Sequence, residues 1–312
     1  MNVLVTGGAG YVGGAVTDEL AKTDHKVRAY DSLLYEECYR KPVEFVYGDV
    51  RDAATLRPQL DWADAVIWLA ALVGDGACAI NPEVSKEINE DAVGGLAEAF
   101  DGRIIFMSTC SVYGAQDKEL DETSPTKPLS VYAATKLGAE QYLKDKNAVV
   151  FRLGTLFGIG DIFSRIRFDL VVNVLTLRAY HTGLIRVFGG EQFRPLLHVR
   201  DAARAAVENL TTEPTGIFNL ARQNVRIIDL AYQVRNHFPD LKIELTEMKF
   251  EDLRNYRASS DRARSVLGFK PGHSIDDGID EIKTLLETKR LKDVDNPRYS
   301  NEKFLSQLDT LT

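Results

Sequence analysis

Short apolar runs alternate with longer segments of helical periodicity along the first half of the chain. The runs hold few polar positions, which is typical of strands buried on both faces of a sheet. The segments between them are long enough to be helices that connect one parallel strand to the next. We predict strands at residues 3–6, 26–30, 44–47, 65–70, 103–107 and 148–153. We predict helices between them at residues 11–22, 53–60, 83–100 and 131–144.

This alternation predicts an α/β fold, a doubly wound, Rossmann-like parallel sheet with helices on both faces. The rhythm loosens after about residue 154. We therefore expect a Rossmann domain over residues 1–155 and a smaller α+β lobe over residues 156–312, with an interleaved boundary and a cleft between the two. The lobe is predicted to contain helices at 168–181, 199–209, 227–237 and 275–288 and strands at 184–188 and 217–220, and the last twenty or so residues are left unassigned.

Composition and net charge limit the kinds of partner that the protein is expected to bind. The 312 residues are 45% hydrophobic and 27% charged, which is ordinary for a globular protein, and the formal net charge is -8. We therefore expect no broad interface with nucleic acid or with an anionic membrane. The longest apolar stretch, at residues 65–73, is too short to span a bilayer. The three cysteines form no C-x-x-C pair and no metal-ligand cluster, and the chain enters a predicted strand at once. We expect a cytoplasmic protein with no signal peptide and no metal site.

A glycine-rich turn joins the first predicted strand to the first predicted helix. Residues 6–14 read T-G-G-A-G-Y-V-G-G, which fits G-x-G-x-x-G at Gly8, Gly10 and Gly13 and a close variant that starts at Gly7. Glycine permits the positive φ and the close backbone approach that a bound diphosphate needs, and the free N–H groups at the helix start face the phosphates. Taken alone, the motif also fits an ordinary tight turn.

Residues at the next strand ends favour a dinucleotide. Asp31 ends the second strand, eighteen residues after Gly13. A carboxylate at this point accepts both hydroxyls of an adenosine ribose and repels a 2′-phosphate, which favours NAD over NADP. Asp49 follows the third strand, where a carboxylate reaches the adenine amine, and the small Ala70 and Ala71 end the fourth strand. Asp31 alone would also fit a solvated strand end.

The fifth strand is predicted to end at Ser108-Thr109, among side chains that can transfer protons. Residues 107–114 read M-S-T-C-S-V-Y-G, and the carboxyl ends of doubly wound strands face the ligand cleft. Further on, S-V-Y-A-A-T-K places Tyr132 and Lys136 on one face of a helix. An ammonium at Lys136 and a positive nicotinamide ring would lower the phenol pKa of Tyr132 from about 10, so that it acts as a base near neutral pH. Thr109 would relay the proton of the substrate hydroxyl. A lone Y-x-x-x-K is also a common surface pair.

T-G-G-A-G-Y-V-G, M-S-T-C-S-V-Y-G and S-V-Y-A-A-T-K together resemble the motifs of the extended short-chain dehydrogenase/reductases, in the NAD-dependent nucleotide-sugar epimerase/dehydratase branch. The resemblance covers most of the chain. It implies an NAD that stays bound, a nucleotide-diphosphate sugar between the lobes, and a homodimer formed through helices 83–100 and 131–144. Asn89, in E-I-N-E-D-A, matches an asparagine of the family. The expected cofactor contacts are Gly7, Gly10, Tyr11, Val12, Asp31, Asp49, Val50, Leu69, Ala70, Ala71, Asn89, Ser108, Tyr132 and Lys136.

The resemblance also implies substrate contacts in the second half. R-P-L-L-H-V-R-D matches a family segment whose arginine, here Arg194, contacts the nucleotide diphosphate. E-D-L-R-N-Y makes Arg254 a second candidate phosphate ligand. The substrate-binding candidates are Thr109, Thr155, Asn173, Arg194 and Arg254.

Thr155 is a departure from the family, which often has asparagine at this position. Threonine donates only one hydrogen bond, so the substrate pose stays open. Asn173, Arg165 and Arg167 lie just beyond and are candidates to replace the missing amide. We otherwise expect both arginines to be solvated.

The nature of the reaction depends on the residues beside Thr109. The family's shared first step removes the proton of a sugar hydroxyl, commonly at C4, through the tyrosine while the hydride moves to NAD. The 4,6-dehydratases carry Asp-Glu directly after the threonine, where this chain has Cys110 and Ser111. Ordinary dehydration is therefore disfavoured, and the leading hypothesis is an NAD-dependent 4-epimerase, with a UDP-sugar as substrate. Cys110 is either an acid or base at a neighbouring carbon or a small buried thiol.

Other functions stay open. A 4-keto nucleotide-sugar reductase, a 3,5-epimerase or an unusual dehydratase would make use of Cys110. Outside enzymes, an NAD-sensing regulator keeps the glycines but often loses the tyrosine or the lysine, and both are present here. The nucleotide base, the sugar and the stereocentre are not set by the sequence.

Overall fold

The computed structural model describes residues 1–246 and 255–308. Seven strands from both halves of the chain form one sheet: β1 (Asn2–Thr6), β2 (Lys26–Asp31), β3 (Glu44–Tyr47), β4 (Ala65–Trp68), β5 (Arg103–Thr109), β7 (Ala148–Leu153) and β11 (Gly216–Leu220). Their order is β11-β7-β5-β4-β1-β2-β3, and every neighbouring pair is parallel. The predicted α/β fold with a doubly wound parallel sheet is confirmed.

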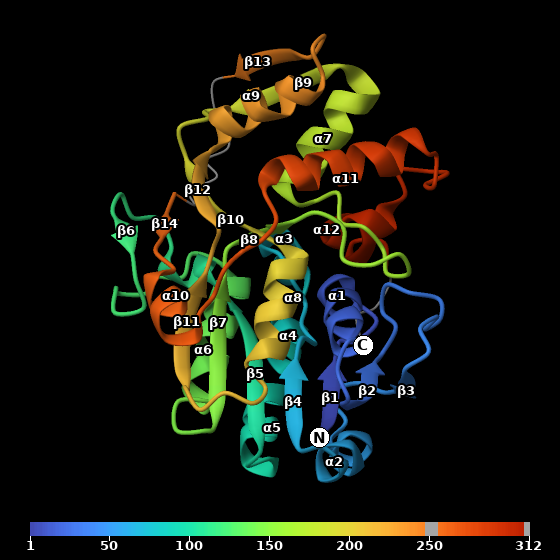
Figure 1. The fold of residues 1–312 in the computed structure, drawn as a ribbon, viewed down its shortest axis with the longest axis vertical. Helices are drawn as coiled ribbons and strands as arrows, with labels where there is room; N and C mark the ends of the chain where they lie inside the picture. The colour runs from blue at the N-terminus through green and yellow to red at the C-terminus, as the bar shows by residue number, and fades with distance from the viewer. Residues whose placement is uncertain (247–254, 309–312) are drawn as a thin grey trace.

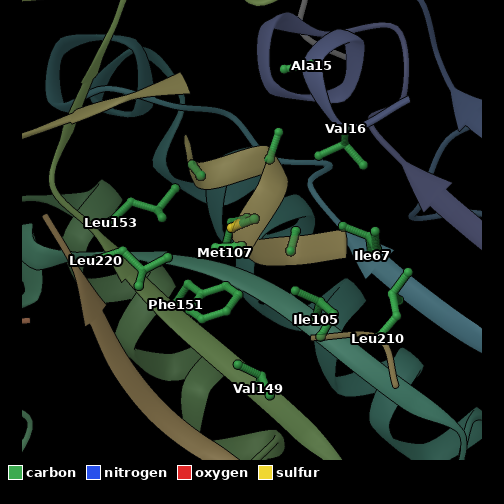
Figure 2. Packing of buried hydrophobic residues seen from close by; sticks show 14 of the residues in the cluster. Ala15, Val16, Ile67, Ile105, Met107, Val149, Phe151, Leu153, Leu210 and Leu220 are labelled. Carbon is green, nitrogen blue, oxygen red and sulfur yellow. The ribbon is translucent and has the colours of Figure 1, made fainter. Parts of the chain in front are cut away.

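Helices cover both faces of this sheet (Figure 1). One face packs against α1 (Tyr11–Leu20) and α8 (Val199–Glu208) through a core of aliphatic side chains. Figure 2 shows this core, in which Phe151 and Ile105 of the sheet lie below α8. The other face packs against α2 (Ala53–Trp62), α5 (Ala92–Ala99) and α6 (Val131–Tyr142) around the buried Trp68 and Phe106. The strands are apolar on both sides because both sides are buried.

The second lobe lies beyond the carboxyl ends of the strands (Figure 1). Its helices α7 (Val171–Thr182), α9 (Ile227–His237) and α11 (Ile275–Glu287) share a core with the neighbouring strands. Its small sheets are β12-β10-β8 (Gln223–Arg226, Phe193–His198, Thr155–Phe157) and β13-β9 (Lys242–Thr246, Leu184–Phe188). The remaining elements are β6 (Glu119–Leu120) with β14 (Arg257–Ala258), α10 (Asp261–Leu267), α12 (Asn301–Leu305) and the 3-10 turns Cys110–Tyr113 and Pro297–Tyr299.

The two lobes are interleaved in sequence. β11 and α8 belong to the second half of the chain but complete the sheet of the first half and its helical layer. Of the helices in the described residues, none is long and apolar enough to cross a membrane.

The predicted helix at 83–100 is interrupted. It consists of α4 (Pro82–Lys86), a π-helical turn at Glu87–Asp91 and α5, and a further helix, α3 (Asp75–Ile80), precedes it. The π turn carries Asn89, whose fully buried side chain bonds to the backbone of Leu72. Such turns commonly serve to redirect a functional side chain.

The fifth strand extends beyond the apolar run 103–107 and ends at Thr109, in agreement with the end predicted at Ser108-Thr109. It continues past Met107 because Ser108 and Thr109 pair with Arg152 and Leu153 of β7. Strand pairing uses only backbone groups, so the polar side chains of Ser108 and Thr109 do not prevent it. The extension carries both hydroxyls to the rim of the sheet.

Candidate active site

A pocket follows the carboxyl ends of the central strands and begins at the glycine-rich turn. Gly7 has a φ of +73°, which favours glycine, and its backbone N–H bonds to the carbonyl of Tyr30 at 2.8 Å. At Gly13, a Cβ atom would lie 2.2 Å from the carbonyl oxygen of Gly7. Only glycine therefore lets α1 pack this closely on the turn, and the N-terminus of α1 faces the pocket. This cradle fits a dinucleotide diphosphate.

Asp31 and Asp49 both line the pocket. The Asp31 carboxylate accepts hydrogen bonds from the backbone N–H groups of Ala9 at 3.0 Å and Leu33 at 2.7 Å. Burial raises its pKa. Asp49 instead forms an ion pair with Arg51, with 2.8 Å between Oδ2 and Nη2. Burial raises the pKa of Asp49, but the hydrogen bonds and charge of Arg51 outweigh burial, so the pKa of Asp49 is lowered. The Asp31 carboxylate is thus fixed against the turn.

Most of the expected cofactor residues surround one cavity. Gly7, Gly10, Tyr11, Val12, Asp31, Asp49, Val50, Leu69, Ala70, Ala71, Ser108, Tyr132 and Lys136 all line it. Asn89 is an exception and does not line the cavity. Its amide accepts from the N–H of Leu72 at 2.8 Å and donates to the carbonyl of the same residue at 2.9 Å. Asn89 therefore positions the loop after β4, which forms the wall.

Tyr132 and Lys136 lie on α6, which begins at Ser130. The Ser130 hydroxyl caps the helix by accepting from the Ala133 N–H at 3.2 Å and donates to Asp75 at 2.7 Å. Tyr132 is partly exposed in the pocket, whereas Lys136 is buried with its Nζ 4.2 Å from the ring centroid of Phe106. The cap fixes the start of the helix and with it the direction of both side chains.

Burial dominates the electrostatics of this pair in the protein without NAD. Burial raises the pKa of Tyr132, although the Arg167 charge and the Thr109 hydroxyl lower it. Burial also lowers the pKa of Lys136 to about 7, against the opposing effect of Glu140. In the protein without NAD, desolvation outweighs the positive charge of Arg167, and the lowered phenol pKa expected beside a bound nicotinamide ring stays a prediction.

A buried ionic network lies behind Lys136. Glu140, one turn further along α6, pairs with Arg152 at 2.6 Å and accepts a hydrogen bond from the Ser108 hydroxyl at 2.5 Å. Arg152 also donates to Tyr113 at 3.0 Å. Ser108 thus lines the pocket but directs its hydroxyl to Glu140. The network joins α6 to β5 and β7 and keeps negative charge near Lys136.

Cys110 lies outside the pocket, contrary to the catalytic role considered above. Its side chain is fully buried, and its thiol donates to the Arg152 carbonyl at 3.1 Å. Burial strongly raises its pKa. The thiol that lies near Tyr132 and Lys136 is Cys78, whose pKa burial raises to about 11. The position of Cys110 fits packing, because β5 continues past Met107 and the chain then turns away from the pocket.

The expected substrate residues are more dispersed. Thr109 is buried beside Tyr132 and accepts from the Ser111 N–H at 3.1 Å. The Asn173 amide is engaged by the backbone of Gly158 and Arg167, so it shapes a loop and does not face the pocket. Thr155 and the buried Arg194 also do not line this pocket. Arg254 lies outside the described residues.

Arg165 and Arg167 are the residues whose surroundings the sequence pattern misjudged, although both were candidates to replace the missing amide. The expectation that they are solvated is wrong, because they are 7% and 9% exposed and both line the pocket with Tyr132. Tyr35 and Asn301 complete the same end of the cavity. The alternation of charged and apolar residues in S-R-I-R-F-D resembled a solvated segment. The only signal was Asp169, two residues after Arg167, which supplies a buried carboxylate partner.

Comparison with known proteins agrees with this fold and pocket. The profile described as the NAD dependent epimerase/dehydratase family matches residues 3–221. The match spans more than half of the chain, so the chain belongs to this family.

Relatives resemble the chain along nearly its whole length. A UDP-glucose 4-epimerase of Corynebacterium glutamicum is 26% identical, over 92% of this chain and 94% of its own. A UDP-glucuronate 4-epimerase of Thermodesulfobacterium geofontis is 27% identical, over 88% of this chain and 93% of its own. Among solved structures, MoeE5 in complex with UDP-glucose and NAD is 26% identical, with a TM-score of 0.78 over 92% of this chain and 99% of that chain.

Proposed function

We propose that the protein is an NAD-dependent nucleotide-sugar 4-epimerase that acts on a UDP-sugar through a transient 4-keto sugar. The observation that carries the proposal is the joint placement of Tyr132, Lys136 and the glycine-rich turn along one pocket. Membership of the NAD-dependent family supports the cofactor, and relatives named as UDP-sugar 4-epimerases support the substrate.

The residues present fit NAD. The glycine-rich turn would hold the diphosphate, and Asp31 would hold the adenosine ribose. The wall formed by Leu69, Ala70 and Ala71 would hold the part of NAD that lies next to Tyr132. When bound, NAD would accept the C4 hydrogen of the sugar as hydride and return it to the other face.

The chain's own residues handle the proton. Tyr132 would take the proton of the C4 hydroxyl and give it back, and Thr109, which lies beside the phenol, would orient that hydroxyl. Lys136 supplies positive charge when protonated, and Glu140 favours that form. Because burial alone raises the pKa of Tyr132, positive charge in the assembled complex must offset desolvation.

The rival reactions that depend on Cys110 have less support. Its thiol is buried outside the pocket and is bound to the Arg152 carbonyl. A reductase, a 3,5-epimerase or an unusual dehydratase would therefore need a different acid or base. An NAD-sensing regulator would have no use for the buried Lys136 beside a pocket-lining phenol.

Incubation with UDP-, dTDP- and GDP-hexoses and with UDP-hexuronic acids, followed by NMR of the sugar, tests the proposal. We expect conversion of a UDP-sugar into its C4 epimer without net consumption of NADH. Only dehydrated products, or no product with any of these substrates, would reject the proposed function.

We also propose a cytoplasmic homodimer joined through α4, α5 and α6. Tyr142, near the end of α6, is 46% exposed, and its ring would lie 3.3 Å from a Cβ at Gly94 on α5. An exposed aromatic ring beside small residues suits close packing between helices. Three free cysteines, Cys38, Cys78 and Cys110, support a reducing compartment.

A further inference from the structure

One end of the pocket is built from three segments that lie far apart in sequence. Tyr35 follows β2, Arg165 and Arg167 lie between β8 and α7, and Asn301 begins α12. The Arg165 guanidinium is held by protein groups. It donates to the Arg298 carbonyl at 2.7 Å and to the Asn301 side chain, and it stacks 3.9 Å from the Tyr35 ring centroid.

Arg167 is only partly engaged. Its Nε and Nη2 each donate to the Asp169 carboxylate at 2.9 Å. Within residues 1–246 and 255–308, no group accepts a hydrogen bond from its third nitrogen, Nη1. Its charge acts on the phenols of Tyr11, Tyr35 and Tyr132, so the guanidinium lies near all three.

The Tyr35 hydroxyl is a second donor without an acceptor. It is buried and has no hydrogen-bond partner in the described part of the chain. A buried donor that stays unpaired is costly. The buried Tyr35 hydroxyl and the open Nη1 of Arg167, at one end of a pocket, indicate that a ligand supplies an acceptor.

The local charge indicates an anion. Three guanidiniums meet here, those of Arg165, Arg167 and Arg298, while only two carboxylates, Asp169 and Glu36, pair with them. Burial and the Arg167 charge lower the pKa of Arg165 to about 10. One positive charge is therefore left without a protein partner in a desolvated place, and an oxyanion from a ligand would balance it.

We propose that Arg167 and Tyr35 bind the carboxylate of a nucleotide hexuronic acid, so that the substrate is a UDP-hexuronate and not a UDP-hexose. This inference rests on the proposed function. If Tyr132 acts at C4, a group that neighbours Tyr132 and touches Arg167 belongs on one of the two adjacent carbons, C3 or C5. In a hexuronic acid C5 bears a carboxylate, whereas C3 bears a neutral hydroxyl and C5 of a hexose bears a neutral hydroxymethyl group. The diphosphate of a bound NAD would be the other oxyanion within the pocket.

Substrate preference of the unmodified protein gives the first test. We expect kcat/KM for UDP-glucuronate to exceed that for UDP-glucose by about 10²-fold, because the hexose would leave the buried Tyr35 hydroxyl unpaired and the excess guanidinium charge unbalanced. Calorimetry should show UDP-glucuronate binding about tenfold more tightly. Equal rates or a preference for UDP-glucose would overturn the inference and leave the proposed function intact. Tighter binding of UDP-glucuronate without epimerisation of any sugar would support the subsite and reject the proposed function.

Tyr35→Phe gives the second test, because it removes only the unpaired hydroxyl. We expect kcat/KM to fall about tenfold for UDP-glucuronate and to change less than twofold for UDP-glucose. Tyr39→Phe, in the same loop but outside this pocket, is the matched control and should change neither value. An equal effect of Tyr35→Phe on both substrates would contradict the proposal.

Arg167→Lys keeps the charge and, with it, a partner for Asp169, while it removes the planar fork. We expect kcat/KM to fall for UDP-glucuronate and to change little for UDP-glucose. The melting temperature of the variant is measured to check that the fold is intact. If either variant instead releases NAD, as read from the absorbance of the co-purified cofactor, the two residues hold the diphosphate and the carboxylate assignment is wrong.

Discussion

At the residue scale, the candidate site contains a buried titratable amine, that of Lys136. Lys136 is 3% exposed, and burial lowers its pKa to about 7. In the unfolded chain this lysine keeps its proton up to about pH 10.5. Burial of the charged amine therefore lowers the free energy of unfolding. This destabilisation is complete below pH 7 and disappears as the pH rises toward 10.5.

Lys136→Met should therefore stabilise the fold while it abolishes epimerisation. The advantage of the variant in free energy of unfolding should shrink by about 2 kcal/mol between pH 7 and pH 9. Urea unfolding at both pH values measures it. Lys86→Met, at a lysine whose side chain is 53% exposed, is the control and should show no such pH dependence. A pH-independent difference for Lys136→Met would mean that the lysine is not desolvated.

Cys110 offers a direct test of packing against catalysis. Serine can keep the hydrogen bond to the Arg152 carbonyl, so Cys110→Ser should change kcat/KM by no more than about threefold. A loss of about 10²-fold or more, with an unchanged melting temperature, would restore the acid/base role that its burial argues against.

At the element scale, the fit of α1 against the first strand shapes the cofactor end of the pocket. Gly13→Ala would place a Cβ 2.2 Å from the Gly7 carbonyl, which is backbone and cannot rotate away. We expect α1 to shift, the melting temperature to fall and co-purified NAD to be lost. Gly95→Ala on α5 meets nothing within 4 Å and should stabilise by about 0.5–1 kcal/mol. Retention of NAD by Gly13→Ala would contradict this account of the turn.

The sequence predicted best what depends on local pattern. The alternation of buried strands and amphipathic helices predicted six strands of the large sheet, and the motifs placed Asp31, Tyr132 and Lys136 on one cavity. The seventh strand, β11, was predicted as a strand but assigned to the second lobe. It failed where distant segments meet. Nothing local shows that Arg165 meets the loop after β2 and α12, or that Asn89 turns inward on a π-helical turn.

At the scale of the whole molecule, the C-terminal helix completes the pocket. Asn301 donates to the Val73 carbonyl, and its backbone N–H donates to Asp169 at 2.9 Å. A segment near the end of the chain thus fixes the partner of Arg167, so the site exists only in the assembled fold.

Subunit number is the prediction that belongs to this scale. Sedimentation equilibrium should give a mass close to twice the 34.8 kDa of one chain. Tyr142→Glu, on the proposed interface, should shift the mass toward a single chain, whereas Tyr180→Glu on the distant α7 should not. A monomeric unmodified protein would refute the dimer.

The central claim is that hydrogen leaves C4 of the sugar and returns to the same carbon while Tyr132 carries the hydroxyl proton. A UDP-sugar labelled with deuterium at C4, incubated in ordinary water and followed by NMR, tests it most directly. The account predicts a C4 epimer that keeps its deuterium, formed more slowly than from unlabelled sugar and at least 10²-fold more slowly by Tyr132→Phe. Loss of the deuterium to water, or normal turnover by Tyr132→Phe, would contradict it.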